Sequence, residues 1–170
     1  MQCGYGKGNE NIYLRCRKEA TKHNERLNSR EGAAELLGVS VSSLANYELG
    51  ITKIVPPDMV IIMADLYNAP QLKTHYYACE CLMGAGAPIA TEISSIELVT
   101  VKIMQSLSSA KLDKIKEQLL DIAADGVISE SEMPVLQEIV NYLNNAAQTI
   151  SELSLICQKC LGSVKNAQSR

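Results

Sequence analysis

Apolar residues recur at intervals of three and four along nearly all of this 170-residue chain, and this spacing constrains the fold more than any other feature. It keeps side chains on one face of an α-helix, whereas a half-buried strand would show strict alternation, which no stretch does convincingly. Phe and Trp are absent. The core must therefore be built from Leu, Ile, Val, Ala and Met, which suits helices packed on helices. The sequence predicts an all-α protein.

Turn residues divide the predicted helices into two groups. Before residue 84 the pattern predicts five helices, at about 10–22, 30–37, 41–48, 57–68 and 71–83. The stretch GAGAP, residues 84–88, has the small residues and the proline of a linker. Beyond it, helices are expected at about 91–108, 110–124 and 130–164. We therefore predict an N-terminal domain of residues 1–84, a linker of 85–90, a helical hairpin or bundle of 91–164 that dimerises or regulates the protein, and a flexible tail of 165–170.

The last predicted helix carries a heptad pattern. Its apolar positions alternate by three and four along a predicted seam of Leu136, Ile139, Leu143, Ala146, Ile150, Leu153, Cys157, Cys160 and Val164. At ~1.5 Å per residue such a helix is ~50 Å long, more than two helices of ~15 residues can cover. We expect a second copy of the chain to cover the remainder. A monomeric three-helix bundle with the two preceding helices stays as the alternative.

Residues 36–50, LLGVSVSSLANYELG, pass from apolar to polar where a buried helix would keep its leucines. Two short helices joined by a glycine turn are typical of a helix-turn-helix. In this interpretation Ser29 and Ser40 cap the helices, Gly38 makes the turn, and the small Ala34 lets the helices cross closely. Leu44 faces the core. The other face of the second helix then presents Val41, Ser42, Ser43 and Asn46, which are side chains that suit the edges of DNA bases.

The stretch SREGAAELLGVSVSSLANYELG, residues 29–50, resembles the helix-turn-helix of phage repressor/Cro-type (XRE) transcriptional regulators, and PPDMVIIMADLYNAP extends the resemblance more weakly to about residue 83. The resemblance implies a repressor-like five-helix DNA-binding domain that dimerises on a near-palindromic operator. The helix 41–48 is then the one that enters the major groove.

The same resemblance implies a role for individual residues. Those matching the base-reading positions are Val41, Ser42 and Asn46. Ser40 and Ser43 match flanking base or phosphate positions, and Arg30 matches a phosphate-contacting position. Arg17 and Glu48 match an internal ion pair. Independently of the resemblance, Lys53 is a phosphate candidate by its charge and its place in the following loop.

The chain departs from the family pattern at two places. Residue 32 is Gly where a helix former is usual, so we expect a slightly weakened helix there. The connection over residues 21–28 is longer than usual, which leaves contacts of Lys22 or Arg26 with DNA unassigned.

Charge and hydropathy set broader limits. Residues 1–57 carry eight Lys and Arg against six Asp and Glu, whereas residues 88–170 carry seven against ten. This weak polarisation permits nucleic-acid binding at the N-terminal end. No apolar run approaches the ~20 residues of a membrane span. The opening residues do not resemble a signal peptide. We therefore expect a cytoplasmic protein with no membrane association, whose six cysteines are reduced thiols.

Two patterns invite metal-binding interpretations that we do not favour. Residues 121–132 resemble half of a calcium-binding loop, but Ala123 stands where a ligand is needed, so a helix hairpin turned at Gly126 fits better. Cys79, Cys81, Cys157 and Cys160 could supply four thiolates to zinc. However, the last two fall on the predicted seam, and a Cys-x-Cys within a helix points its thiols apart. We expect no metal and no cofactor.

The chain shows no nucleophile–base pair and no glycine-rich phosphate loop, so we do not expect an enzyme. The leading hypothesis is a sequence-specific transcriptional regulator, a repressor that binds double-stranded DNA as a homodimer. The alternative is a protein-interaction module of the phage inhibitor or adaptor type. There the C-terminal helices bind another protein, and the helix-turn-helix is autoregulatory or vestigial.

Overall fold

The computed structural model describes residues 10–84 and 86–168, with side chains to residue 164. The all-α prediction is confirmed, since no strand occurs among these residues. The N-terminal domain, used here for residues 10–84, contains α1 (Ile12–Ala20), the 3₁₀ turn η1 (Glu25–Asn28), α2 (Arg30–Leu37), α3 (Val41–Glu48), α4 (Pro57–Leu66) and α5 (Gln71–His75). The C-terminal arm, residues 91–168, contains α6 (Ile96–Ser106), α7 (Ser109–Ala123) and α8 (Met133–Gln168).

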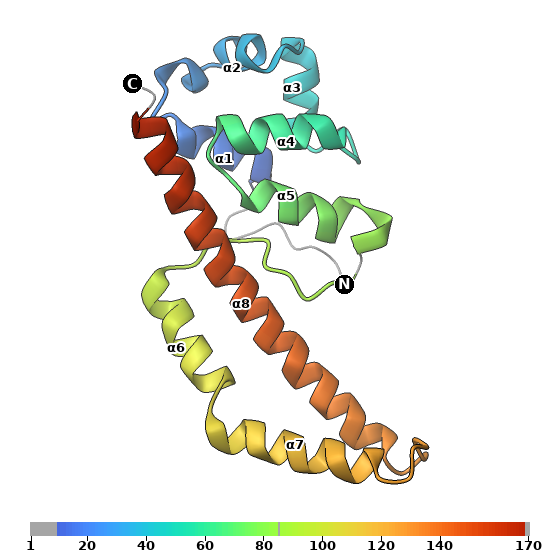
Figure 1. The fold of residues 1–170 in the computed structure, drawn as a ribbon. Helices are drawn as coiled ribbons and strands as arrows, with labels where there is room; N and C mark the ends of the chain where they lie inside the picture. The colour runs from blue at the N-terminus through green and yellow to red at the C-terminus, as the bar shows by residue number, and fades with distance from the viewer. Residues whose placement is uncertain (1–9, 85, 169–170) are drawn as a thin grey trace.

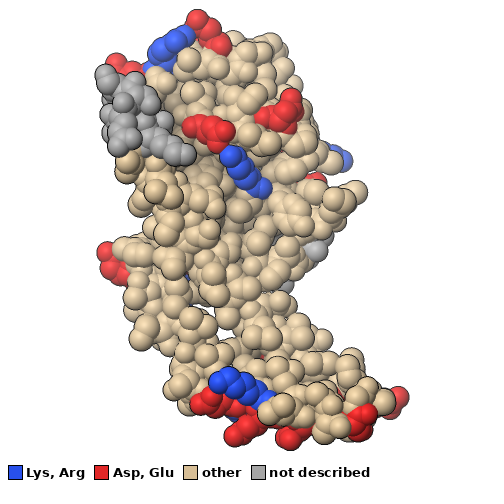
Figure 2. All heavy atoms as spheres, viewed as in Figure 1, with Lys and Arg blue, Asp and Glu red and all other residues tan. Residues whose placement is uncertain are grey.

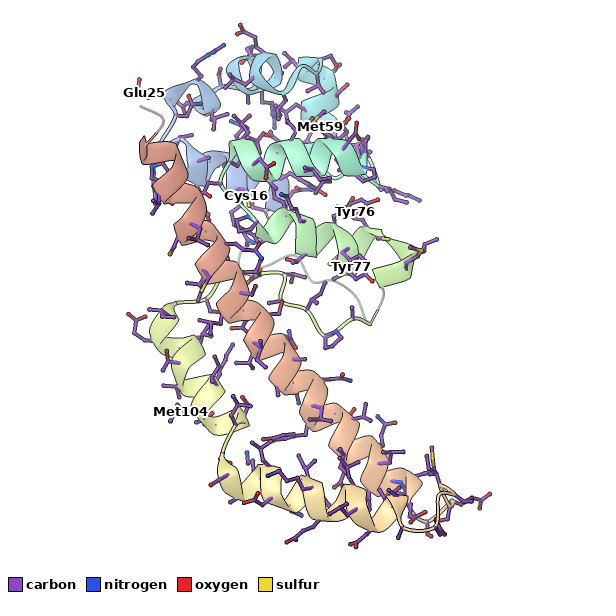
Figure 3. The ribbon with its side chains drawn as sticks, viewed as in Figure 1. Cys16, Glu25, Met59, Tyr76, Tyr77 and Met104 are labelled. Carbon is purple, nitrogen blue, oxygen red and sulfur yellow. The ribbon has the colours of Figure 1, made fainter. Side chains whose placement is uncertain are left out.

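The helices of the N-terminal domain enclose one core. Its centre consists of four side chains with no exposed surface, which come from η1, α3, α4 and α5: Leu27, Leu44, Met63 and Leu72. The apolar faces of α1 and α2 close around them through small residues such as Ala20 and Ala34. Cys16 of α1 is also part of this core (Figure 3). Burial raises the pKa of its thiol to about 12, so Cys16 packs as a small apolar group.

The fifth helix of this domain is shorter than its pattern predicts. The sequence predicts one helix over 71–83, but α5 ends at His75 and continues as a π-helical turn, Tyr76–Glu80, and a 3₁₀ turn, Leu82–Gly84. The end of this segment also brings two stretches of backbone close together. A Cβ atom at position 84 would lie 1.8 Å from the carbonyl oxygen of Tyr77, so this position requires glycine.

The C-terminal arm is built along α8, a helix of 36 residues. Figure 1 shows α6 beside the middle of α8, α7 crossing below it, and the C-terminal end of α8 returning to the N-terminal domain. Lys102 of α6 forms an ion pair with Glu152 of α8 at 2.9 Å, and the Tyr142 hydroxyl donates to the carbonyl of Ser106. The helix runs four residues beyond its predicted end at 164.

The predicted seam of α8 is divided in the structure. Ile139 and Ala146 are buried, whereas Leu143 is 44% exposed and Ile150 is 51% exposed. The seam is therefore wider than one neighbour can cover, because α6 and α7 reach only one side of it. The three-helix alternative accounts for the buried side and leaves the exposed side without a partner among the described residues.

The loop between α7 and α8 has the hairpin geometry that we favoured. Gly126 adopts a left-handed conformation with φ of 73°. The backbone N–H of Ser129 donates to the Glu132 carboxylate at 2.7 Å, and the Ser129 hydroxyl donates to the same oxygen at 2.6 Å. No group of three or more potential metal-ligating side chains occurs within residues 10–84 and 86–168.

The cysteines correct one expectation. Cys16, Cys81, Cys157 and Cys160 are free thiols, but Cys79 is disulfide-bonded, so the prediction that all six are reduced is wrong at that position. The prediction was based on the expected cytoplasmic location alone. It took no account of which cysteines the fold brings close together. As for membranes, none of the described helices combines the length and the apolarity that a span requires.

Candidate nucleic-acid interface

The helix-turn-helix is formed by α2, a tight turn and α3. Ser29 caps α2 by accepting from the Gly32 N–H at 3.0 Å, and Ser40 caps α3 by accepting from the Ser43 N–H at 3.0 Å. Between them Gly38 has φ of 69° and ψ of 29°, a left-handed conformation that suits glycine at a helix C-terminus. These local signals, all visible in the sequence, fix the angle at which α3 leaves α2.

The two faces of α3 differ sharply. Leu44 and Glu48 point inward with 0% and 2% of their surface exposed. On the opposite face Val41, Ser42 and Asn46 are exposed. The structure thus brings the three residues assigned to base reading onto one accessible surface, which we call the outer face of α3.

Hydroxyl groups gather at the N-terminal end of α3. The Ser40 oxygen lies 2.9 Å from that of Ser42 and 2.8 Å from that of Ser43. Ser40 and Ser42 are exposed, whereas Ser43 is half-buried. The positive end of the α3 dipole and three hydroxyl groups therefore meet at one point, an arrangement that suits a phosphate or a base edge.

A buried ion pair holds α3 to the rest of the domain. The Arg17 guanidinium binds both carboxylate oxygens of Glu48, one of them at 3.1 Å, and donates to the carbonyl of Leu27 at 2.7 Å. The carboxylate of Glu48 raises the pKa of Arg17, so the guanidinium keeps its charge. The pair links α1, η1 and α3, and so sets the position of the outer face.

Arg30 has a second role that the resemblance does not imply. Its Nε donates to the Glu48 carboxylate at 2.7 Å, while 36% of the side chain stays exposed. One edge of the guanidinium is thus fixed by the protein, and the exposed part remains accessible to an anion. Because Arg presents donors in a rigid fork, one side chain can serve both.

Lys53 lies in the loop between α3 and α4 and is exposed. No carboxylate of the described residues pairs with it. In contrast, Arg26 pairs with Glu35 at 2.9 Å. An unpaired cation beside the end of α3 is the better phosphate ligand, because no existing ion pair has to be broken.

Two side chains that sequence reasoning missed, Asn11 and Glu80, hold the far end of α3 and its loop. The Asn11 side chain donates to the carbonyl of Tyr47 at 3.1 Å. Glu80 accepts from the Tyr13 hydroxyl at 2.5 Å and from the backbone N–H of Val55 at 2.8 Å. Burial and this carboxylate raise the pKa of Tyr13, so its hydroxyl stays a donor. Each contact joins residues far apart in sequence, so no local pattern signals it.

The C-terminal arm leaves the outer face of α3 uncovered. The end of α8 contacts the domain at Asn68, whose side chain donates to the carbonyl of Lys159 at 3.2 Å and to the Ser163 hydroxyl at 2.8 Å. Lys159 also pairs with Glu19 of α1 at 3.8 Å. Figure 1 shows this contact on the side of the domain away from α3.

Comparison with known proteins gives one match. A family model described as a helix-turn-helix domain matches residues 14–75, a little over a third of the chain. The matched range runs from α1 through α5 and includes Arg17, Arg30, the outer face of α3 and Lys53. No curated protein and no solved structure matches the chain significantly. The comparison and the geometry therefore agree on a helix-turn-helix domain within residues 14–75.

Proposed function

We propose that this protein is a sequence-specific transcriptional regulator of the phage repressor/Cro type, a repressor that binds a near-palindromic operator as a homodimer. The observation that carries the proposal is the outer face of α3. It is polar and exposed in the full chain, and the C-terminal arm docks elsewhere. The buried ion pair between Arg17 and Glu48 also holds α3 in a fixed position. Such a fixed position is useful for a helix that binds a partner and is not needed for a helix that only contacts water.

The contacts divide by chemistry. Asn46 can form two hydrogen bonds with adenine, Ser42 can donate or accept, and Val41 can touch a thymine methyl group. These three residues provide specificity in the proposal. Arg30 and Lys53 bind phosphates and set the register, together with the hydroxyls of Ser40 and Ser43 at the α3 N-terminus.

The charged residues bear on how binding should depend on salt. Figure 2 shows that Lys and Arg are sparse on the viewed face of the molecule, and that Asp and Glu gather beside Lys over α7 at its lower end. The proposed phosphate contacts of Arg30 and Lys53 should make affinity fall steeply as salt rises, while the preference for the operator is retained.

The substitution Asn46→Ala tests the assignment of base reading. It should weaken binding to a selected operator by about 1–3 kcal/mol, or roughly 5–150-fold, and leave binding to random DNA nearly unchanged. The operator is first selected from random duplexes, and both affinities are then measured by gel shift across a salt series. Lys53→Ala is the matched control, because loss of a phosphate contact weakens both affinities alike. Equal losses on both DNAs for Asn46→Ala would contradict its role.

One feature favours a second candidate, a module that binds another protein. The C-terminal arm exposes several large apolar side chains, including Met104 and Leu120, each 71% exposed. Figure 3 shows Met104 on α6 directed away from α8. If no DNA shift occurs even at low salt, this candidate replaces the first. In either case we propose a cytoplasmic protein that acts by binding rather than by catalysis.

A further inference from the structure

An apolar stripe runs the length of α8 on the side that no other described element covers. Its positions alternate by four and three, and all but Ser154 are apolar: Leu136, Val140, Leu143, Ala147, Ile150, Ser154, Cys157, Leu161 and Val164. Val140 is 41% exposed, Ile150 is 51% exposed and Leu161 is 63% exposed. The stripe shares five positions with the predicted seam but is rotated away from the buried side. It has the a/d spacing that winds two helices around each other.

Two other parts of the α8 surface have partners within the chain. Toward the arm, Ile139 and Ala146 are buried. Nearer the C-terminus, Leu155 is 1% exposed, and Lys159 contacts Asn68. The stripe is therefore the apolar part of the helix surface that remains for an external partner, and it extends for about eight turns at ~3.6 residues per turn, interrupted by the polar Ser154.

The absence of charge along the middle of α8 indicates what kind of partner can bind there. Residues 139–151 include no Asp, Glu, Lys or Arg. The positions that border the stripe on its other edge are also uncharged: Gln137, Asn144, Ser151 and Gln158. Two identical neutral helices can approach without like-charge repulsion, whereas an acidic or basic partner would find no complementary charge here. A helix of the same heptad pattern is the best geometric fit, and this chain supplies one.

We propose that the stripe on α8 is the interface between two copies of this chain, which pair their α8 helices in parallel about a two-fold axis. The orientation rests on the proposed function. The N-terminal domain is attached near the C-terminal end of α8, through Asn68 and Glu19. Antiparallel pairing would place the two domains at opposite ends of a helix ~54 Å long. Parallel pairing places them at the same end, where two α3 helices can approach the ~34 Å spacing of successive major grooves.

Cys157 provides a direct test, because it lies on the stripe and is exposed as a free thiol. In a parallel pair the two copies of a seam position face each other. Such thiols can approach the Cα separation of about 4.4–6.8 Å that a disulfide needs. With mild oxidation by diamide, the full chain carrying Cys160→Ser should form a covalent dimer on a non-reducing gel. The matched variant Cys157→Ser, which keeps the neighbouring Cys160, should not.

A second measurement tests the interface without relying on cysteines. Sedimentation equilibrium should show that the unmodified chain is a dimer and that Ile150→Asp is a monomer with unchanged helical circular dichroism. Asn145→Asp introduces the same charge at an exposed position off the stripe and should remain dimeric. A monomeric unmodified chain, or a dimer that survives Ile150→Asp, would overturn the interface.

A dimer disrupted by Ile150→Asp that yields no Cys157-dependent crosslink would overturn the parallel orientation. None of these measurements involves DNA. A crosslinked dimer that fails to shift any duplex would therefore refute the regulator and leave the interface intact.

Discussion

The N-terminal domain and the C-terminal arm use the same apolar residue types at the same helical spacing, yet they bury them differently. In the domain, Leu27, Leu44, Met63 and Leu72 are fully enclosed by short helices that cross at several angles. In the arm, burial is scattered, and residues such as Leu120 remain largely exposed. The difference lies in geometry, since short crossing helices surround a common centre whereas a long helix flanked on one side cannot.

This contrast assigns different tasks to the two regions. The domain has a complete core and a buried ion pair between Arg17 and Glu48, so it can hold α3 in place by itself. The arm leaves a largely apolar surface on α8 that a partner would have to cover. A regulator needs both properties, because base contacts require a rigid helix, whereas a two-fold operator requires two such helices at a fixed spacing.

The largest expected effect comes from truncating one leucine in each region. Leu44→Ala removes a side chain with no exposed surface, so it should lower the free energy of unfolding by about 2–5 kcal/mol. Leu120→Ala in α7, where the side chain is 71% exposed, should change it by less than about 0.5 kcal/mol. Urea denaturation followed by circular dichroism measures both. Similar losses for the two variants would show that the arm has a core of its own.

The sequence predicted what local physics decides and missed what distant contacts decide. The caps at Ser29 and Ser40 and the turn at Gly38 follow from rules spanning a few residues, and the structure contains all three. The break after His75 did not follow from the sequence, and neither did the close approach of Gly84 to the backbone of Tyr77. On α8 the apolar spacing was visible, but which side of it would be covered depends on where α6 lies.

Gly32 is a second position where a distant contact decides the outcome, and its substitution should change stability less than Leu44→Ala does. The sequence treats it as a weak helix residue, so alanine should help. In the structure, however, a Cβ atom there would lie 2.3 Å from the carbonyl oxygen of Arg26 in η1. The long connection after α1 thus folds against α2 and requires the glycine. Gly32→Ala should destabilise the domain by about 1–3 kcal/mol, as overpacking does, measured by thermal unfolding. A stabilised variant would mean that η1 can move away freely.

The smallest expected effect is a difference between the two regions in how their stability depends on pH. Both histidines of the chain lie in the N-terminal part, and none lies in residues 91–168. Burial, assisted by Arg15 and opposed by Glu92, lowers the pKa of His75. Because the unfolded chain then binds more protons than the folded one, stability should fall as the pH drops through the ordinary histidine value of 6.5.

Tyrosine signals can assign this loss to one region, because six of the seven tyrosines precede residue 84 and the seventh is Tyr142. Urea denaturation at pH 7 and at pH 5, followed by near-ultraviolet circular dichroism, should therefore show a lower unfolding midpoint at pH 5 for the N-terminal domain. The far-ultraviolet signal should retain the helices of the arm. His75→Gln removes the titrating group and should flatten the tyrosine-detected dependence. If that variant keeps the full dependence, the acid sensitivity belongs to carboxylates, which both regions share, and pH does not distinguish the domain from the arm.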